Sequence, residues 1–196
     1  EAIELARSNG LCAVASGDDL RLAGPFTAVA RVVGDIAMRG GGAPRGVALA
    51  IGMAAARPDD DPARLAAASR AAIDAAIAAG PGRSQLLGAL VATRRVPALL
   101  ALGEQLVDLA VAEPNALRAL LGASAEIVAL DTPLAVMDRL RGGVHALAAR
   151  LGVGAVASRD ESMDGALRGL AVLIREFPGM FDSGAARLPL AYAVLR

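Results

Sequence analysis

Residues 46–53 read GVALAIGM, and this short apolar segment is the strongest indication of the fold. Every residue from Val47 to Ile51 is apolar, so the segment lacks the apolar–polar alternation of a half-exposed strand. A continuous apolar run of this length is typical of a strand covered by helices on both faces. The segment therefore predicts a buried strand in an α/β protein.

Five other short apolar segments have the same character and predict further strands. They are Leu11–Ser16, Leu86–Thr93, Ala125–Leu130, Val153–Ser158 and Leu188–Leu195. The first three strand-plus-helix units recur at about 35 residues, a spacing typical of parallel βαβ units. Right-handed crossovers would bring the carboxyl ends of such strands to one edge, where α/β proteins bind ligands. We expect parallel strands alternating with helices in a single domain over residues 1–196.

Glycine, proline and aspartate mark the ends of the predicted helices. The helix Phe26–Arg39 follows a Gly-Pro turn and ends at three glycines. The helix Asp61–Ala79 begins with Asp-Pro, a favourable pair for an N-cap and first turn, and ends before Gly80. The other predicted helices are Pro97–Ala112, Asn115–Leu121, Pro133–Leu151 and Glu161–Phe177.

Composition limits the classes of function that the chain can serve. The 196 residues are 55% hydrophobic but only 2% aromatic, so the core must consist of Ala, Leu, Val and Ile. Twenty basic residues, all of them Arg, balance twenty acidic ones. A chain without net positive charge and with few aromatic rings is not expected to bind nucleic acid.

The sequence also indicates in which cellular compartment the chain is expected. A single cysteine, Cys12, excludes a disulfide within the chain and fits a reducing compartment. We see neither a signal peptide nor a continuous apolar stretch of about 20 residues, the length that spans a membrane. A cytoplasmic location without membrane contact is therefore expected. The first residue is not Met, which is consistent with a segment of a longer parent protein.

Acidic residues follow several predicted strands, and two explanations are open. They could form a polar rim for a ligand or metal, or they could cap the helices that follow, which we prefer because a carboxylate accepts the free N–H groups of a helix start. We assign no metal site. The residues concerned are Asp18, Asp19, Asp131, Asp160 and Glu161.

Few other residues suggest chemistry. Gly52 and Gly88 lie within predicted strands, where glycine permits close approach of a ligand or relieves crowding beneath a helix. The only histidine, His145, falls among apolar residues of a predicted helix and is expected to pack there. Three arginines could hold a phosphate through bidentate hydrogen bonds. They are Arg83, Arg94 and Arg95, which flank the third predicted strand.

Short motifs follow one another in a distinctive order. They are the segment Ala2–Asp18, PFTA at 25–28, RGVALAIG at 45–52, DPARLA at 61–66, GR at 82–83, LG at 87–88, LDTPLAVMDRL at 130–140 and GVGAV at 152–156. In this order they resemble the bacterial luciferase-like superfamily of flavin- or F420-dependent oxidoreductases, which includes monooxygenases. Residues 2–93 resemble the family's beginning and residues 117–177 its C-terminal end.

The resemblance implies a TIM barrel, often dimeric, that binds FMN or F420 and a small-molecule substrate at the carboxyl ends of the strands. The residues implied to line the cofactor site are Ser16, Asp18, Gly52 and Gly88. The chain is shortened and degenerate relative to the family, because a closed barrel needs eight strands and six are predicted. An incomplete (β/α) barrel is therefore expected, and no catalytic acid or base is assigned.

Two alternatives stay open. A chain without a convincing catalytic group, but with small apolar helix faces, could be a non-enzymatic subunit or interaction module. In addition, VGDIAM at 33–38 and PRGV at 44–47 resemble the ATP-binding group of AIR synthases and thiamine-phosphate kinases. The Gly-Gly-Asp-Thr motif of that group has no counterpart here, so only an ATP-binding fragment would be implied.

Overall fold

The computed structural model describes residues 2–40, 49–56, 59–112, 114–115, 117–118, 121–122, 185 and 187–196. The chain divides into two compact units. The first unit contains Glu1–Gln85, Ala92–Pro97 and Arg196, and the second contains Leu86–Val91 and Ala98–Leu195.

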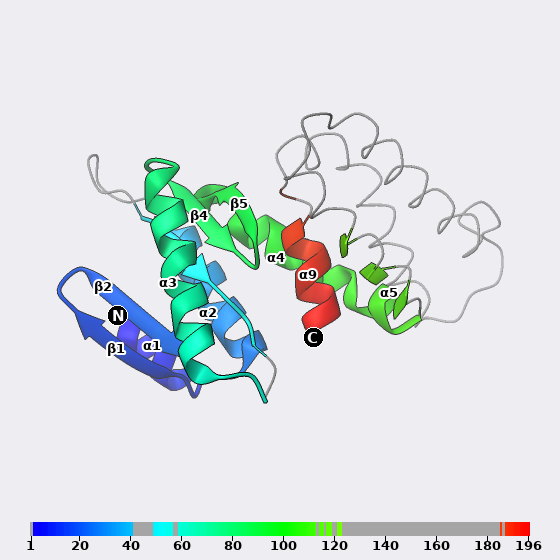
Figure 1. The fold of residues 1–196 in the computed structure, drawn as a ribbon, viewed down its shortest axis with the longest axis horizontal. Coiled ribbons are helices and arrows are strands. Elements are labelled where there is room, and N and C mark those ends of the chain that lie inside the picture. The colour runs from blue at the N-terminus through cyan, green and yellow to red at the C-terminus, as the bar shows by residue number, and fades with distance from the viewer. Residues whose placement is uncertain are drawn as a thin grey trace. The chain divides into compact units, whose positions relative to one another are not determined.

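The first unit begins with a helix and a two-stranded ribbon. Helix α1 (Ala2–Ser8) contacts strand β1 (Cys12–Ser16), which pairs with strand β2 (Asp19–Ala23) in antiparallel orientation. The two strands are joined by Gly17 and Asp18, and Gly17 adopts a φ of 58°. A two-residue turn with glycine at its first position suits the twist of a hairpin. In Figure 1 the ribbon lies beside α1.

Helix α2 (Phe26–Gly40) completes the small core beneath the ribbon. Ala6, Leu11 and Val32 are buried together, and Ala13 and Leu22 of the ribbon's inner face pack against them. The predicted helix Phe26–Arg39 is therefore confirmed, with its end at Gly40.

A second sheet of the molecule contains three strands in the order β3-β4-β5. These strands are β3 (Ile51–Met53), β4 (Arg83–Leu86) and β5 (Ala89–Ala92). Helix α3 (Pro62–Ala78) contacts β3. Asp61 caps α3 by accepting a hydrogen bond from the backbone N–H of Ala63, as the Asp-Pro pair predicts.

The connection between β4 and β5 is a two-residue turn, so these strands run antiparallel. A bond from the backbone N–H of Thr93 to the carbonyl of Gly82, 2.8 Å long, continues the pairing beyond the strand ends. The side chains of Ser84 and Thr93 are buried on the inner side of this hairpin. A short 3-10 helix, η1 (Thr93–Arg95), follows and contacts α2.

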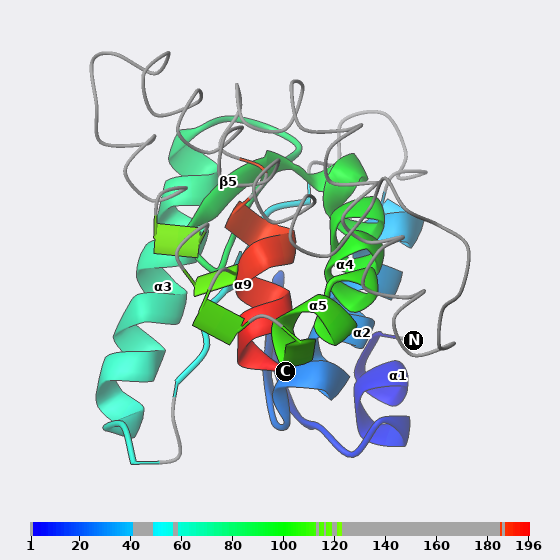
Figure 2. The ribbon, with the colours of Figure 1, turned by 90° about the vertical axis from the view of Figure 1, so that its right-hand side faces the viewer.

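The described part of the second unit is mainly helical. Helix α4 (Val96–Gln105) leads into α5 (Val107–Ala112), and α9 (Arg187–Leu195) lies beside α5 (Figure 2). All residues of α9 from Leu188 to Ala193 are buried. Gly103 of α4 allows the close approach of Tyr192, whose ring atoms lie within 2.9 Å of the position of a Cβ. Pro189 is tolerated because it stands in the first turn of its helix.

The structure confirms a mixed α/β protein but corrects several predicted strands. The segment Leu86–Thr93 is not one strand, because it contains the turn between β4 and β5. The segment Leu188–Leu195 is a helix. The strands expected at Ala125–Leu130 and Val153–Ser158 lie outside the described residues.

Strand direction also differs from the expectation of a parallel sheet. The segment Leu11–Ser16 forms a strand, but its partner is β2, an antiparallel strand that was not predicted. A two-residue turn can only join antiparallel strands, whereas parallel pairing requires a long crossover. The described strands form two small sheets, and no closed barrel is found among them.

Candidate functional site

Ser16 and Asp18 lie together at the turn of the β1–β2 ribbon. Ser16 is the last residue of β1 and pairs with Asp19, while Asp18 occupies the turn itself. All three side chains are exposed. Asp18 and Asp19 therefore close a hairpin and do not cap a helix, since α2 begins only at Phe26. The capping explanation is wrong for this pair, because Gly17 favours a turn at a point where a helix was expected.

Gly52 lies in β3, in a different sheet from Ser16 and Asp18. A Cβ atom at this position would come within 2.5 Å of the backbone nitrogen of Ile73 in α3. The absence of a side chain therefore lets the helix backbone rest on the strand. This contact gives Gly52 a packing role, the second of the two explanations that the sequence left open.

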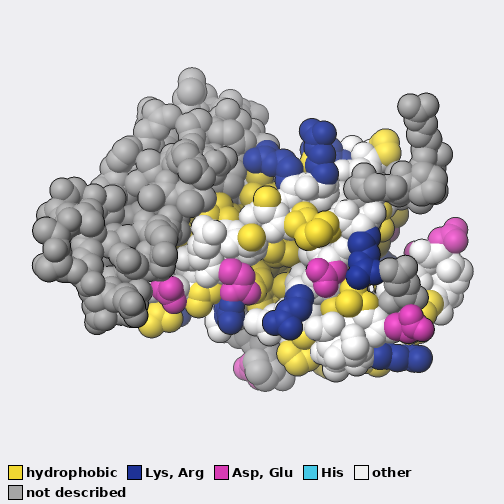
Figure 3. All heavy atoms as spheres, turned by 180° about the vertical axis from the view of Figure 1, so that it is seen from behind, with side chains coloured by type: hydrophobic (Ala, Val, Ile, Leu, Met, Phe, Trp, Pro, Cys, Tyr) yellow, Lys and Arg dark blue, Asp and Glu magenta, His cyan; other side chains and the backbone are white. Residues whose placement is uncertain are grey.

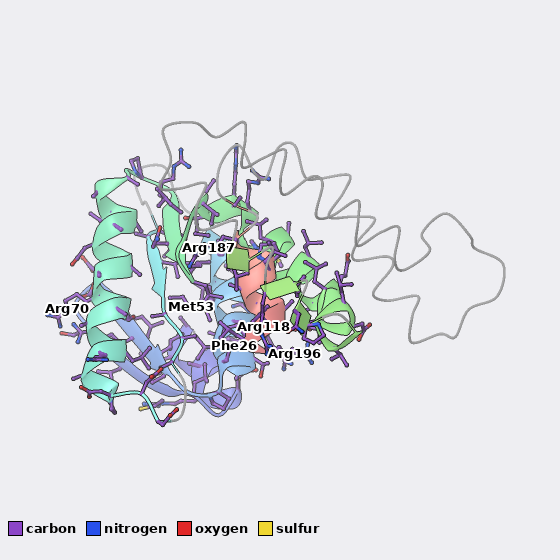
Figure 4. All side chains as sticks on the ribbon, turned by 45° about the vertical axis from the view of Figure 1, so that its right-hand side comes forward. Phe26, Met53, Arg70, Arg118, Arg187 and Arg196 are labelled. Carbon is purple, nitrogen blue, oxygen red and sulfur yellow. The ribbon has the colours of Figure 1, made fainter. Side chains whose placement is uncertain are left out.

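Gly88 stands in the turn between β4 and β5, with a φ of 82°. Arg187 crosses this turn, and its Nε lies 2.6 Å from the position of a Cβ on Gly88. The same Nε donates a hydrogen bond of 3.1 Å to the carbonyl of Leu87. Leu87 has a φ of 51°, which L-residues rarely adopt. Figure 4 labels Arg187 at the start of α9 beside this turn.

The structure thus brings together only two of the four candidate residues, Ser16 and Asp18. Gly52 and Gly88 have neighbours within the protein that account for glycine at each position. Among the described residues, no group of three or more His, Cys, Asp and Glu side chains could hold a metal ion. His145, Asp131, Asp160 and Glu161 fall outside the residues that the structure describes.

The outer face of the β1–β2 ribbon is open to solvent. Its side chains come in three cross-strand pairs, Cys12 with Ala23, Val14 with Arg21, and Ser16 with Asp19, and all six are exposed. Val14 keeps 58% of its surface accessible, a large fraction for a β-branched apolar side chain. Other large apolar side chains are also exposed, and hydrophobic groups reach the surface in several places in Figure 3.

The two edges of the ribbon differ in chemistry. Strand β1 reads CAVAS and contains neither a charged residue nor proline, whereas β2 carries Asp19 and Arg21. Proteins usually protect an edge strand with charge, proline or a covering element, because its free N–H and C=O groups can pair with another chain. Strand β1 contains neither a charged residue nor a proline to protect its edge.

Sequence reasoning missed this ribbon, although a signal was present. Two segments of strand-forming residues, 12–16 and 19–23, flank a two-residue Gly-Asp connection. Such a connection predicts a hairpin. The apolar residues before Gly17 were instead interpreted as a strand buried on both faces.

Comparisons with known proteins give no relative. No family model, curated protein or solved structure matches the chain. Within the described ranges, none of the helices combines the length and apolar character that crossing a membrane requires.

Proposed function

We propose that the chain is a non-enzymatic subunit that self-associates as a homodimer through the edge of β1. The observation that carries this proposal is the uncharged, proline-free edge of β1 beside the exposed side chain of Val14. A zero net charge adds no overall repulsion between two copies. Addition of a strand to such an edge is a common mode of recognition between proteins.

The register of the ribbon defines which backbone groups are available. Ser16 and Asp19 flank a two-residue turn, so the backbone groups of Ser16 are directed toward β2. The direction of the backbone N–H and C=O groups alternates from one residue to the next along an antiparallel strand. The N–H and C=O groups of Ala13 and Ala15 are therefore directed to the outer edge of β1.

This alternation suits pairing with a second copy. A two-fold axis through Val14 would place Ala13 of one copy opposite Ala15 of the other, so that both pairs exchange hydrogen bonds. The two Val14 residues would then face each other as a non-hydrogen-bonded pair, with Cα atoms about 4.5 Å apart. Both valine side chains would lose exposed surface, and a continuous four-stranded sheet would result.

Light scattering on the full chain tests the self-association. The parent chain is expected to be dimeric, and Val14→Lys is expected to be monomeric because two like charges would meet at the axis. Ala23→Lys is the matched control, since it adds the same charge to the same face but on β2. Circular dichroism should show both variants folded. A monomeric parent chain, or dimers in both variants, would overturn the proposal.

Cross-linking tests the register separately. In a Cys12→Ser background, Val14→Cys is expected to give a disulfide-linked dimer on mild oxidation, because the predicted Cα separation lies within the range of a disulfide. Arg21→Cys in the same background lies on β2 and is expected to stay monomeric under denaturing conditions. Dimers that do not cross-link through position 14 would contradict the register and leave the self-association standing.

A flavin- or F420-dependent oxidoreductase is the second candidate function. In its favour, α2 begins at Phe26 and α3 at Pro62, where the luciferase-like motifs imply helix starts. Titration with FMN and with F420 tests it, through the absorbance at ~450 nm and ~420 nm, respectively, that these cofactors show. Saturable binding of either cofactor would support an oxidoreductase, and its absence would count against one.

Binding of ATP, implied by the AIR-synthase resemblance, stays a prediction that a titration with Mg²⁺-ATP checks.

A further inference from the structure

Three arginines stand at the open end of the β4–β5 hairpin, at the opposite end from its turn at Leu87 and Gly88. Between Asp74 and Glu104 the sequence contains these three arginines and no acidic residue, although the whole chain is neutral. They are Arg83 at the start of β4 and Arg94 and Arg95 in η1. All three arginines belong to the first unit, where they form a local concentration of positive charge.

The hairpin brings the first two arginines close together. The backbone bond between Thr93 and Gly82 brings the residues that follow them close in space, namely Arg94 in η1 and Arg83 at the start of β4. The buried hydroxyls of Ser84 and Thr93 fix which side of the hairpin is internal. Arg83 precedes Ser84 in a strand, so alternation turns its side chain to the opposite, solvent side. Arg94 is exposed as well, and Arg95 is half-buried.

These charges are not neutralised by the part of the protein that the structure describes. None of Arg83, Arg94 and Arg95 forms an ion pair there. Nearby guanidinium groups of like charge repel one another, so an added anion would relieve that repulsion as well as accept hydrogen bonds.

We propose that Arg83, Arg94 and Arg95 bind the phosphate group of a small-molecule ligand. Each guanidinium presents parallel N–H donors, and a phosphate dianion offers oxygens to more than one of them at once. A carboxylate carries a single charge and two oxygens, so one arginine would satisfy it. The nearby stretch has no aromatic residue on which a base could stack, which favours a phosphate over a single-stranded nucleic acid.

Titration of the full chain with inorganic phosphate at constant ionic strength tests the site. NMR of the arginine Nε–H groups is expected to show saturable shifts at these three residues. The double variant Arg83→Gln/Arg94→Gln is expected to weaken binding about tenfold or more, which corresponds to about 1.4 kcal/mol. Arg64→Gln/Arg70→Gln, which removes the same charge from exposed positions on α3, is the matched control and is expected to bind as the parent does.

Shifts that do not saturate, or equal weakening in both double variants, would overturn the proposal, because either result indicates a general ionic effect. Neither double variant alters the hydrogen bond between the Ser84 and Thr93 hydroxyls, so both variants should give the same circular dichroism spectrum. The outcome is independent of self-association, since Arg83 lies in the β3-β4-β5 sheet and Arg94 and Arg95 lie in η1, none of them in the β1–β2 ribbon.

Discussion

The hydroxyl oxygens of Ser84 and Thr93 lie 2.7 Å apart in the interior of the first unit. Thr93 gives its single hydroxyl proton to the carbonyl of Leu49, at 3.3 Å. Ser84 must therefore be the donor in the contact between the two hydroxyls. These bonds link β4, the residue that directly follows β5 and the residue two positions before β3, so they connect the ends of all three strands of the sheet.

Removal of the two hydroxyls is expected to have unequal effects. Thr93→Val leaves the Ser84 donor and the Leu49 carbonyl without their partner and should cost about 1–3 kcal/mol of unfolding free energy. Ser84→Ala leaves Thr93 bonded to Leu49 and should cost about 0.5–1.5 kcal/mol. Urea unfolding measures both, and the double variant should lose less than the sum. Additive losses would show that the two hydroxyls are not coupled.

Gly52→Ala is expected to destabilise the first unit. The added methyl group would meet the backbone of Ile73, which cannot move without displacing α3 from β3. Overpacking of this kind typically costs about 1–3 kcal/mol. Gly122→Ala is the control, because nothing lies within 4 Å of a Cβ at that position. Unfolding free energies that are equal for the two variants would contradict the packing role of Gly52.

Asp61→Ala is expected to lower the unfolding free energy by about 1 kcal/mol, the usual effect of removing an N-cap. The carboxylate accepts a bond of 2.9 Å from the N–H of Ala63 at the first turn of α3. Asp59→Ala removes an exposed carboxylate that does not cap the helix and should change stability by less than about 0.5 kcal/mol. An equal effect of the two substitutions would point to general charge and not to capping.

Arg187→Gln is expected to destabilise the second unit by about 1–2 kcal/mol, because the Nε–H bond to Leu87 holds a turn whose backbone is strained. Arg118→Gln, at an exposed position of the same unit, should have little effect. Thermal unfolding followed by circular dichroism compares the two. A neutral Arg187→Gln would mean that the turn is held by other contacts.

Local signals in the sequence predict helices α2 and α3 well. The Asp61–Pro62 pair sets the start of α3, and the glycines after Arg39 set the end of α2, because caps and breakers act within a few residues. Apolar runs are less informative. The apolar segment Leu188–Leu195 is a helix that is buried from Leu188 to Ala193, and a continuous apolar run does not distinguish a buried helix from a buried strand.

The turns that decide strand direction were harder to predict. The turn between β4 and β5 contains Leu87 at a positive φ, where glycine or asparagine is usual, so no turn residue marks its first position. The candidate site depended on all strands running in parallel, and it lost its common edge once Ser16 and Asp18 were placed in a hairpin. The arginines at the open end of β4 and β5 were recognised from the sequence, but their proximity follows only from the hairpin.

The position of α9 affects the order in which the chain can fold during synthesis. Arg187 bonds to Leu87, and Tyr192 bonds to Glu104, so contacts of the second unit join residues 100 and 88 positions apart. Since α9 is buried from Leu188 to Ala193, that unit lacks part of its interior until these residues leave the ribosome. The first unit draws its described elements from the first 97 residues and can assemble earlier. Nascent chains that stall before residue 187 would therefore expose the apolar surfaces of α4 and α5 and become targets for chaperones.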